Sequence, residues 1–240
     1  MTRTWPARSV AKLWMTLTAT RPRVVAGREQ AGSPPLPGPA GRLVVDAAFD
    51  VVALAASAGG LTALSSVLAD LPAGFPAGIL VVQHLDPRHR SLMADILSRR
   101  TRLEVKQAEE GDCLAGGRVY IAPPNRHLLL NGDGSLSLTQ SELVHFVRPS
   151  ADLLFESVAA SYRDRAIAVV LSGSGGDGSM GVKAIKKMGG TVLAQDKMTS
   201  EFFGMPGAAI DSGNVDFVLP LEEIAPALVA LVMKGQAQWQ

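Results

Sequence analysis

Cysteine is almost missing from this sequence of 240 residues, in which Cys113 stands alone. A single cysteine excludes an intrachain disulfide and any cysteine-based metal cluster, and it fits a reducing compartment, so we expect a cytoplasmic protein. Histidine is scarce as well. The four histidines show neither i, i+4 pairing nor a close carboxylate, so the sequence predicts no metal site.

Long apolar runs are also missing. No stretch approaches the ~20 apolar residues that a membrane-spanning helix needs, so no membrane insertion is expected. The net charge is only +1, yet it is unevenly spread: 1–42 hold seven basic residues and one acid, which leaves 16 basic and 21 acidic residues in 43–240. Aromatic residues make up 5% and do not interleave with basic ones, so we expect no nucleic-acid-binding face.

The first 48 residues differ in composition from the rest of the chain. They are rich in Arg, Pro and Gly, they have no sustained apolar period, and the run 32–39 is typical of an extended linker. We expect 1–48 to be a disordered leader, with an organelle transit peptide or a later translation start at Met15 as alternatives. One domain is expected over 49–234, followed by a short tail at 235–240.

The body of the chain alternates between strand and helix patterns. Strands are expected at 49–54, 78–83, 103–107, 118–122, 166–171, 191–194 and 216–219, and helices at 61–68, 89–100, 150–163, 178–188 and 221–233. Most of the strands are apolar throughout, which indicates a doubly wound α/β fold with a mostly parallel sheet and helices on both faces. The turn residues 131–134 predict an antiparallel β-hairpin insertion at 127–139.

One serine lies on a small-residue turn between a strand and a helix. The turn is Ala55-Ala56-Ser57-Ala58-Gly59-Gly60, and it follows the strand expected at 49–54. On such a turn a hydroxyl can stand clear of the backbone while amides of the helix N-terminus point at the group it attacks. The alternative is that Ser57 serves only as a turn or N-cap residue.

Two further side chains fall at the same edge of the expected sheet as Ser57. His84 follows the strand 78–83, and Asp177 lies in the loop after the strand 166–171. Ligands of open parallel sheets bind beyond the carboxyl ends of the strands. A serine needs a nearby base to become a nucleophile, an imidazole suits that task, and a carboxylate can orient the imidazole. We therefore predict a set of nucleophile, base and orienting acid.

Other residues compete for these roles. His127 also follows a strand and is a weaker candidate for the base, because it begins the hairpin. Asp196 ends the strand 191–195 and is the main rival of Asp177. His89 and His145 lie in helix-start or loop contexts and are expected to be solvated.

The glycine-rich loop at 173–178 allows a second interpretation. It satisfies Gly-x-Gly-x-x-Gly between a strand and a helix, with Asp196 about 20 residues further on, which is the dinucleotide-binding pattern. That pattern normally opens its domain, whereas here over a hundred residues of α/β sequence precede it. It also leaves Ser57 and His84 without a role. The exposed amides of such a loop can equally bind an oxyanion.

From about residue 49 to 233 the chain resembles the catalytic domain of the chemotaxis protein-glutamate methylesterases, the CheB type. Six ordered blocks carry the resemblance: 56–60, 83–84, 120–123, 148–155, 172–178 and 203–206. The resemblance implies Ser57 as nucleophile, His84 as general base and then acid, and Asp177 as the orienting carboxylate. It also implies an oxyanion hole made of the backbone amides of Ala58 and Ser174.

The same resemblance implies a cytoplasmic serine hydrolase of chemotaxis signal transduction. Its reaction would be removal of methyl groups from glutamate γ-methyl esters of chemoreceptor-like proteins, with deamidation of receptor glutamines as an added activity and no cofactor. Two alternatives stay open at this point. One is a dinucleotide-binding α/β module that uses the loop 173–178, and the other is a non-catalytic receptor-docking module.

The sequence departs from the family pattern at a few positions. The family turn usually begins Gly-Ala-Ser-Thr, whereas Ala55 and Ala58 stand here, and a methyl group at position 55 is expected to crowd the turn. Ser174 and Gly176 replace the usual Met and Asn of the glycine loop. Members commonly carry an N-terminal receiver domain, for which 1–48 are too few. Activity is therefore expected to be constitutive or governed by a separate regulatory protein.

Overall fold

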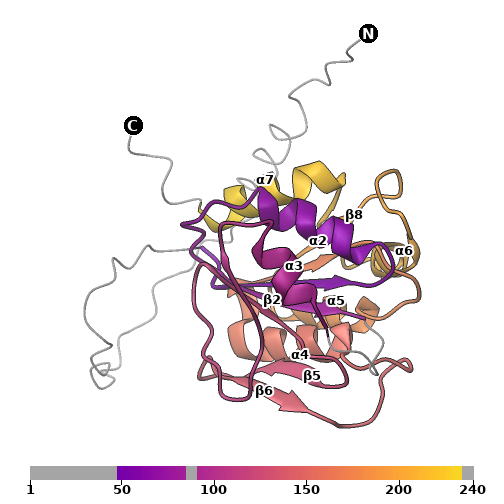
Figure 1. Ribbon diagram of the computed structural model, residues 1–240. Coiled ribbons are helices and arrows are strands. Elements are labelled where there is room, and N and C mark those ends of the chain that lie inside the picture. Colours follow the sequence, from indigo (N-terminus) through magenta and orange to yellow (C-terminus); the bar gives the residue numbers. More distant parts are fainter. Residues whose placement is uncertain (1–47, 85–90, 234–240) are drawn as a thin grey trace, which may run out of the picture. The chain divides into compact units, whose positions relative to one another are not determined.

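A computed structural model describes residues 48–84 and 91–233. Seven parallel strands form one sheet in the order β3-β4-β2-β1-β7-β8-β9 (Figure 1). The strands are β1 (Val51–Ala56), β2 (Gly78–Gln83), β3 (Glu104–Gln107), β4 (Arg118–Ile121), β7 (Ala166–Val170), β8 (Thr191–Gln195) and β9 (Phe217–Leu219). This arrangement confirms the predicted α/β class and its parallel sheet.

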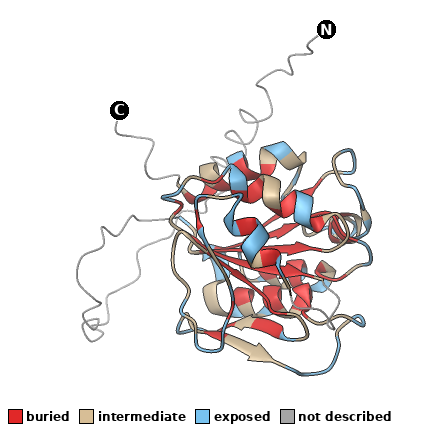
Figure 2. Ribbon diagram, viewed as in Figure 1, coloured by how far each residue is buried: buried red, intermediate tan, exposed pale blue. Residues whose placement is uncertain are grey.

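Helices cover both faces of the sheet. They are α2 (Gly60–Ala69), α3 (Met93–Ser98), α4 (Ala151–Tyr162), α5 (Ser179–Lys187), α6 (Gly204–Asp211) and α7 (Leu221–Val232), with one 3-10 turn, η1 (Arg163–Arg165). On one face α2 packs against α3 and α7, and on the other α5 packs against α4 and α6 (Figure 1). Every residue of β1, β2 and β7 is buried because of this double cover (Figure 2).

An antiparallel hairpin lies against α4, outside the main sheet (Figure 1). It pairs β5 (His127–Leu130) with β6 (Leu136–Thr139), as predicted from the turn residues between them. The apolar side chains of Leu128 and Leu136 are buried in the core that α4 shares with the sheet. The hairpin therefore supports the face of α4 that is turned away from the sheet.

The chain reverses its direction across the sheet at β1. From β1 it proceeds to β2, then to β3 at one edge, and steps back to β4 between them. It then crosses to β7 on the other side of β1 and proceeds through β8 to β9 at the opposite edge. The helices that follow β1 and β7, α2 and α5, cover opposite faces. The carboxyl ends of β1 and β7 are thus the topological switch point, where open α/β sheets bind their ligands.

Several predicted bounds differ from the structure. β1 ends at Ala56 rather than at 54, and α3 begins at Met93 rather than at 89. Helix α6 was not predicted, because Gly204, Pro206 and Gly207 are poor helix formers and only packing on α5 and the sheet compensates for them. The expected leader 1–48 lies, apart from its last residue, outside the described residues, as does the tail 235–240. None of the described helices is long and apolar enough to cross a membrane.

Candidate active site

Ser57 occupies a closed turn directly after β1. Its backbone N–H donates to Ser172 O (3.0 Å), and its own carbonyl accepts from Gly60 N (2.9 Å). Gly59 closes the turn with φ +73°, a left-handed conformation that glycine adopts without strain. Helix α2 has Gly59 as its N-cap and no side-chain cap bond, so Ser57 is not an N-cap residue. Its hydroxyl makes no hydrogen bond with any other described residue.

The methyl group of Ala55 does not crowd this turn. Ala55 is an interior residue of β1, and it is paired with Val82 of β2 on one side and Val170 of β7 on the other. Its side chain belongs to the buried core. The expectation of crowding was wrong because β1 extends to Ala56, so the turn begins two residues later, at Ser57.

His84 follows the neighbouring strand β2 and lies beside the same turn. Its backbone N–H donates to Ala56 O (3.2 Å), which continues the pairing of the two strands by one residue. In the side chain, Nε2–H donates to Asp177 Oδ2 (2.8 Å). This bond leaves Nδ1 as the ring nitrogen free to accept a proton. The familiar protease triad uses the two nitrogens in the opposite sense, with Nε2 as the base.

Asp177 is 3% exposed and accepts hydrogen bonds at both carboxylate oxygens. Oδ2 accepts from His84 and from Ala151 N (2.6 Å), and Oδ1 accepts from Ser150 Oγ (2.9 Å) and Asp152 N (3.1 Å). Three of these donors belong to the N-terminus of α4, where the helix dipole also favours an anion. Burial alone raises the pKa of Asp177, but the hydrogen bonds from His84 and the two amides outweigh it and hold the pKa below its usual value.

Ser150 organises the N-terminus of α4 around this carboxylate. It is the N-cap residue, with extended backbone angles (φ −110°, ψ 135°), and its hydroxyl accepts from Leu153 N while donating to Asp177. Its own backbone N–H donates to Nδ1 of His127 (3.1 Å). The sequence predicts an N-cap at Ser150, but it does not indicate that the cap residue also binds Asp177.

His127 is a structural histidine in this fold. It is fully buried, with Nδ1 accepting from Ser150 and Nε2–H donating to Glu142 O (3.0 Å). Both ring nitrogens are therefore engaged, so the side chain cannot replace His84 as the base. Burial, assisted by the nearby charge of Arg148, lowers the pKa of His127 and keeps the ring neutral.

A second buried carboxylate, which sequence reasoning missed, joins α4 to α5. Asp152 accepts from Met180 N (3.0 Å) and Gly181 N (2.7 Å) at the start of α5. The imidazole of His145 is largely exposed, as expected. It is not only solvated, because its Nε2 lies 3.1 Å from the other carboxylate oxygen of Asp152. Burial first, and then the charge of Asp177, raise the pKa of Asp152. An acidic residue in the first turn of α4 was the available signal.

The glycine loop after β7 lies against Ser57. A Cβ added to Gly173 would stand 2.4 Å from Met205 Sδ and 3.0 Å from Ser57 Cβ, so only glycine permits this approach. The backbone amides of Ala58 and Ser174 donate no hydrogen bond to other described residues. Asp196, the rival acid, accepts from Thr199 N and Oγ1 and so closes its own turn.

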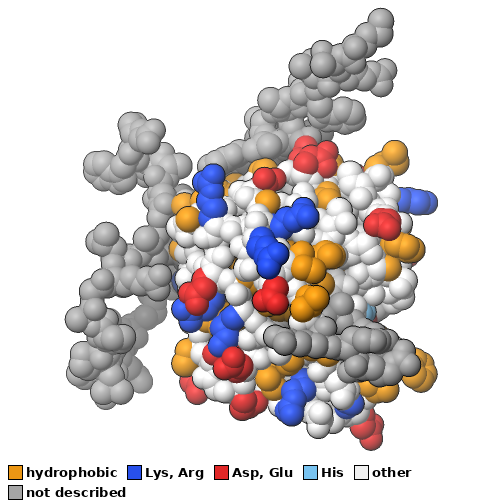
Figure 3. Space-filling view, in the orientation of Figure 1, with side chains coloured by type: hydrophobic (Ala, Val, Ile, Leu, Met, Phe, Trp, Pro, Cys, Tyr) orange, Lys and Arg blue, Asp and Glu red, His pale blue; other side chains and the backbone are white. Residues whose placement is uncertain are grey.

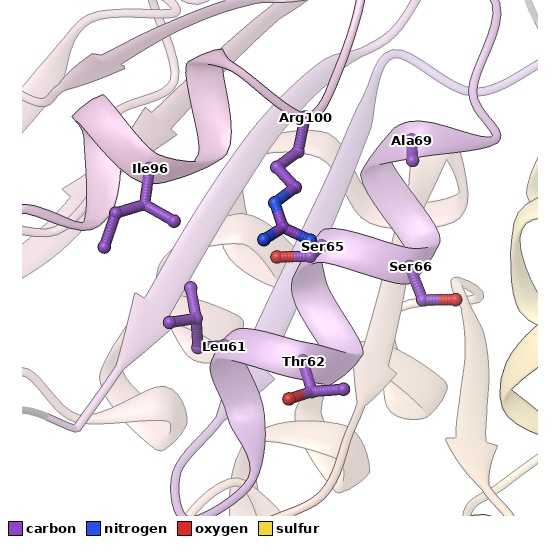
Figure 4. Close-up of a pocket in the computed structure, with 7 residues that line it drawn as sticks. All are labelled: Leu61, Thr62, Ser65, Ser66, Ala69, Ile96 and Arg100. Carbon is purple, nitrogen blue, oxygen red and sulfur yellow. The ribbon is translucent and has the colours of Figure 1, made fainter.

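A groove between α2 and α3 is lined by none of these side chains. It has a volume of about 410 Å³ and is lined by Leu61, Thr62, Ser65, Ser66, Ala69, Ile96 and Arg100 (Figure 4). Apolar and basic side chains gather next to one another on this face of the molecule (Figure 3). Because Ser57, His84 and Asp177 do not line the groove, it is not the candidate active site. Across residues 48–84 and 91–233, no group of three or more acidic, His or Cys side chains is arranged to hold a metal ion.

A doubly wound α/β domain with a serine, a histidine and an aspartate at the switch point of its sheet is typical of serine hydrolases. The chain belongs to the CheB methylesterase family, whose sequence model matches residues 52–228. The family predicted from the sequence is thereby confirmed. The match favours the methylesterase prediction over the dinucleotide-binding module and the docking module.

Named relatives and a solved structure agree with the family. The chain is 44% identical over 188 residues to a protein-glutamate methylesterase/protein-glutamine glutaminase of Moorella thermoacetica, which covers 77% of this chain and 44% of that protein. It is 40% identical to a putative enzyme of the same name from Leptospira interrogans, over 76% of this chain and 95% of that protein. The crystal structure of the Thermotoga maritima CheB methylesterase catalytic domain aligns with a TM-score of 0.74 and 40% identity, over 77% of this chain and 99% of that one.

Proposed function

We propose that this chain is a serine hydrolase that removes methyl groups from glutamate γ-methyl esters of chemoreceptor-like proteins. The observation that carries the proposal is the 2.8 Å hydrogen bond from His84 to the buried Asp177, next to the turn that presents Ser57. The names of the relatives add deamidation of receptor glutamines, because an amide can pass through the same acyl-enzyme as an ester.

In the first half of the reaction Ser57 Oγ attacks the ester carbonyl carbon. Nδ1 of His84 accepts the hydroxyl proton as the bond forms. The amides of Ala58 and Ser174 donate to the oxyanion of the tetrahedral intermediate. The intermediate then collapses, the ester C–O bond breaks, and methanol leaves with the proton from His84. The product is an ester between Ser57 and the glutamyl side chain.

The second half releases the glutamate. A water molecule gives a proton to Nδ1 of His84 and attacks the acyl carbon. The bond to Ser57 Oγ breaks, and Oγ recovers its proton from the imidazolium. The receptor side chain leaves as a free acid that ionises at neutral pH. When the substrate is glutamine, ammonia takes the place of methanol as the leaving group.

Asp177 stabilises the imidazolium form of His84 in both halves. Because hydrogen bonds hold its pKa below the usual value, its carboxylate is fully ionised at neutral pH. The bond to Nε2 fixes the tautomer that leaves Nδ1 unprotonated and able to act as a base. Asp177 therefore acts through His84 and keeps its own charge throughout the cycle.

We place this reaction in the cytoplasm, on a methylated chemoreceptor-like partner. Support comes from the family match and from the single cysteine, which fits a reducing compartment.

Methanol release from a methylated receptor fragment tests the proposal. The wild-type chain should release methanol, and Ser57→Ala should slow the release by about three orders of magnitude or more, because the nucleophile is lost. Ser65→Ala, the same change eight residues further on in α2, serves as the matched control and should leave the rate unchanged. Equal release by Ser57→Ala and the wild type would remove Ser57 from the role.

A further inference from the structure

Gln83 ties the carbonyl of the proposed nucleophile to the carbonyl of the proposed base. It is the last residue of β2 and is 5% exposed. Its side-chain Nε2 donates to Ser57 O (2.7 Å) and to His84 O (3.1 Å). We propose that Gln83 is a positioning residue that sets the separation and orientation of Ser57 and His84. This inference rests on the proposed function.

The bridge stands where the backbone pairing of the two strands ends. Ala56 of β1 is paired with Gln83 of β2, and His84 N–H to Ala56 O is the last backbone bond between the two segments among the described residues. The next carbonyl, that of Ser57, accepts from Gly60 N–H and from no backbone N–H of β2. The side-chain amide of Gln83 supplies the missing donor. Its two N–H groups lie in one rigid plane, so they fix both carbonyls relative to each other.

The rest of the Gln83 side chain indicates a role beyond packing. Oε1 is buried and accepts no hydrogen bond from the described residues. Exchanging the amide nitrogen and oxygen would turn Oε1 toward two carbonyl oxygens, so the donor assignment is fixed by the neighbours. A buried acceptor without a partner costs stability, which an apolar side chain of the same shape avoids. The residue at this position is therefore explained by its two donated bonds.

Gly60 provides the space that this amide needs. A Cβ built on Gly60 would stand 2.0 Å from Gln83 Oε1 and 3.0 Å from Gln83 Cδ. A side chain at position 60 would therefore displace the amide from Ser57 O. The two neighbouring glycines of the nucleophile turn thus have different tasks, since Gly59 supplies the left-handed angle and Gly60 accommodates Gln83.

The rate at which a fluorophosphonate labels Ser57 measures this geometry directly. Labelling requires that the Ser57 hydroxyl and the His84 imidazole are correctly oriented toward each other, but it requires no receptor substrate. Gln83→Met keeps the length of the side chain and removes both donors. We expect it to slow labelling 10- to 100-fold, because displacements near 1 Å cost about that much. With a methylated receptor fragment, kcat should fall by a similar factor while KM changes less than twofold.

A stability control separates positioning from general loosening of the fold. Leu231→Ala truncates a buried side chain of α7, a helix that does not contribute to the site. It should lower the melting temperature at least as much as Gln83→Met and leave the labelling rate within twofold of the wild type. If Gln83→Met does not fold, Gln83→Asn takes its place, because it keeps the amide but withdraws it by one methylene.

Gln83→Glu adds a pH-dependent test that a packing role would not pass. The ionised carboxylate would face two carbonyl oxygens and donate nothing, whereas the protonated carboxyl donates one hydrogen bond. Burial beside two carbonyl oxygens disfavours the ionised carboxylate and should raise the pKa of this carboxyl toward the tested range. The labelling rate of Gln83→Glu relative to the wild type should therefore rise several-fold as the pH is lowered from 8 to 5.5. The same ratio for Gln83→Met should stay flat, since methionine does not titrate.

The outcomes are distinguishable. If the wild type is not labelled at Ser57, the proposed function fails. If the wild type is labelled, and the methionine or asparagine variant reacts within twofold of it, Gln83 does not position the pair. A labelling loss in Leu231→Ala that matches the loss in Gln83→Met would likewise overturn the proposal, as would a flat ratio for Gln83→Glu.

Discussion

The carboxylate of Asp177 accepts four hydrogen bonds and donates none, so its surroundings are built for an anion. In Asp177→Asn, an NH₂ group would replace one of the two carboxylate oxygens and would face the hydrogen-bond donors that this oxygen now accepts from. We expect activity to fall by three to four orders of magnitude through the lost orientation of His84. The unfolding free energy should fall by roughly 1–3 kcal/mol for the donors left unpaired. Methanol release and urea unfolding at pH 7 measure the two effects.

Acid should remove the stability that Asp177 contributes. Its folded-state pKa lies below the usual value, so in acid the unfolded chain binds its proton first. The contribution is fully present above about pH 4, where an unperturbed aspartate is ionised, and it is lost as the pH falls through the depressed folded value. Urea unfolding should therefore show the gap between wild type and Asp177→Asn shrinking from pH 7 to pH 3. A gap that is the same at both values would contradict this account of the carboxylate.

At the scale of single elements, the first turn of α4 connects the fold to the site. Its cap, Ser150, both starts the helix and donates to Asp177. Ser150→Ala should cost about 1 kcal/mol of unfolding free energy for the lost cap. It should also lower kcat, because the carboxylate that orients His84 loses one of its donors.

Ser150→Thr is the matched control for the cap, because it keeps the hydroxyl. Two measurements on both variants test these expectations: the unfolding free energy in urea and the rate of methanol release. Threonine should recover most of both losses. Full activity in Ser150→Ala would show that the hydroxyl does not help to hold Asp177.

Helices α4 and α5 approach each other closely at Gly181. A Cβ there would stand 2.6 Å from Phe155 Cβ and 3.0 Å from Asp152 O. In an exposed helix interior, glycine to alanine gains up to about 1 kcal/mol. Here we expect Gly181→Ala to lose roughly 1–3 kcal/mol instead, because the helices must move apart. The separation would also disturb the bond from Gly181 N to Asp152.

Thermal unfolding checks this close approach. Gly132→Ala in the hairpin turn is the control, since a Cβ at that position meets nothing within 4 Å and the backbone angle is unexceptional. The control should unfold within about a degree of the wild type, and Gly181→Ala should unfold several degrees lower. A Gly181→Ala protein as stable as the wild type would mean that α4 and α5 are less tightly packed at Gly181 than these distances indicate.

At the scale of the whole molecule, alternating patterns sufficed to predict a parallel sheet with two helical faces. Continuous apolar strands such as β1 and β7 can be buried only in that way. Ligands of open parallel sheets bind beyond the carboxyl ends of the strands, and this principle predicts, without any distance information, that Ser57, His84 and Asp177 lie close together. The structure adds the hydrogen bond between His84 and Asp177.

Sequence reasoning did not find what depends on contacts between distant segments. It missed α6, whose glycines and proline disfavour a helix until packing compensates. It did not find that Asp152 joins α4 to α5, or that Gln83 bridges two strand ends, because each role depends on partners fixed only in the folded chain. Nor could it tell which nitrogen of His84 faces the acid.

In the proposed mechanism Ser57 is the nucleophile of a hydrolase, activated by His84 and Asp177. Peptide mapping by mass spectrometry after fluorophosphonate treatment tests it most directly. We expect one adduct, on Ser57, which forms at a greatly reduced rate in His84→Gln and is absent in Ser57→Ala. An adduct on a different serine, or labelling that proceeds at the wild-type rate in His84→Gln, would contradict it.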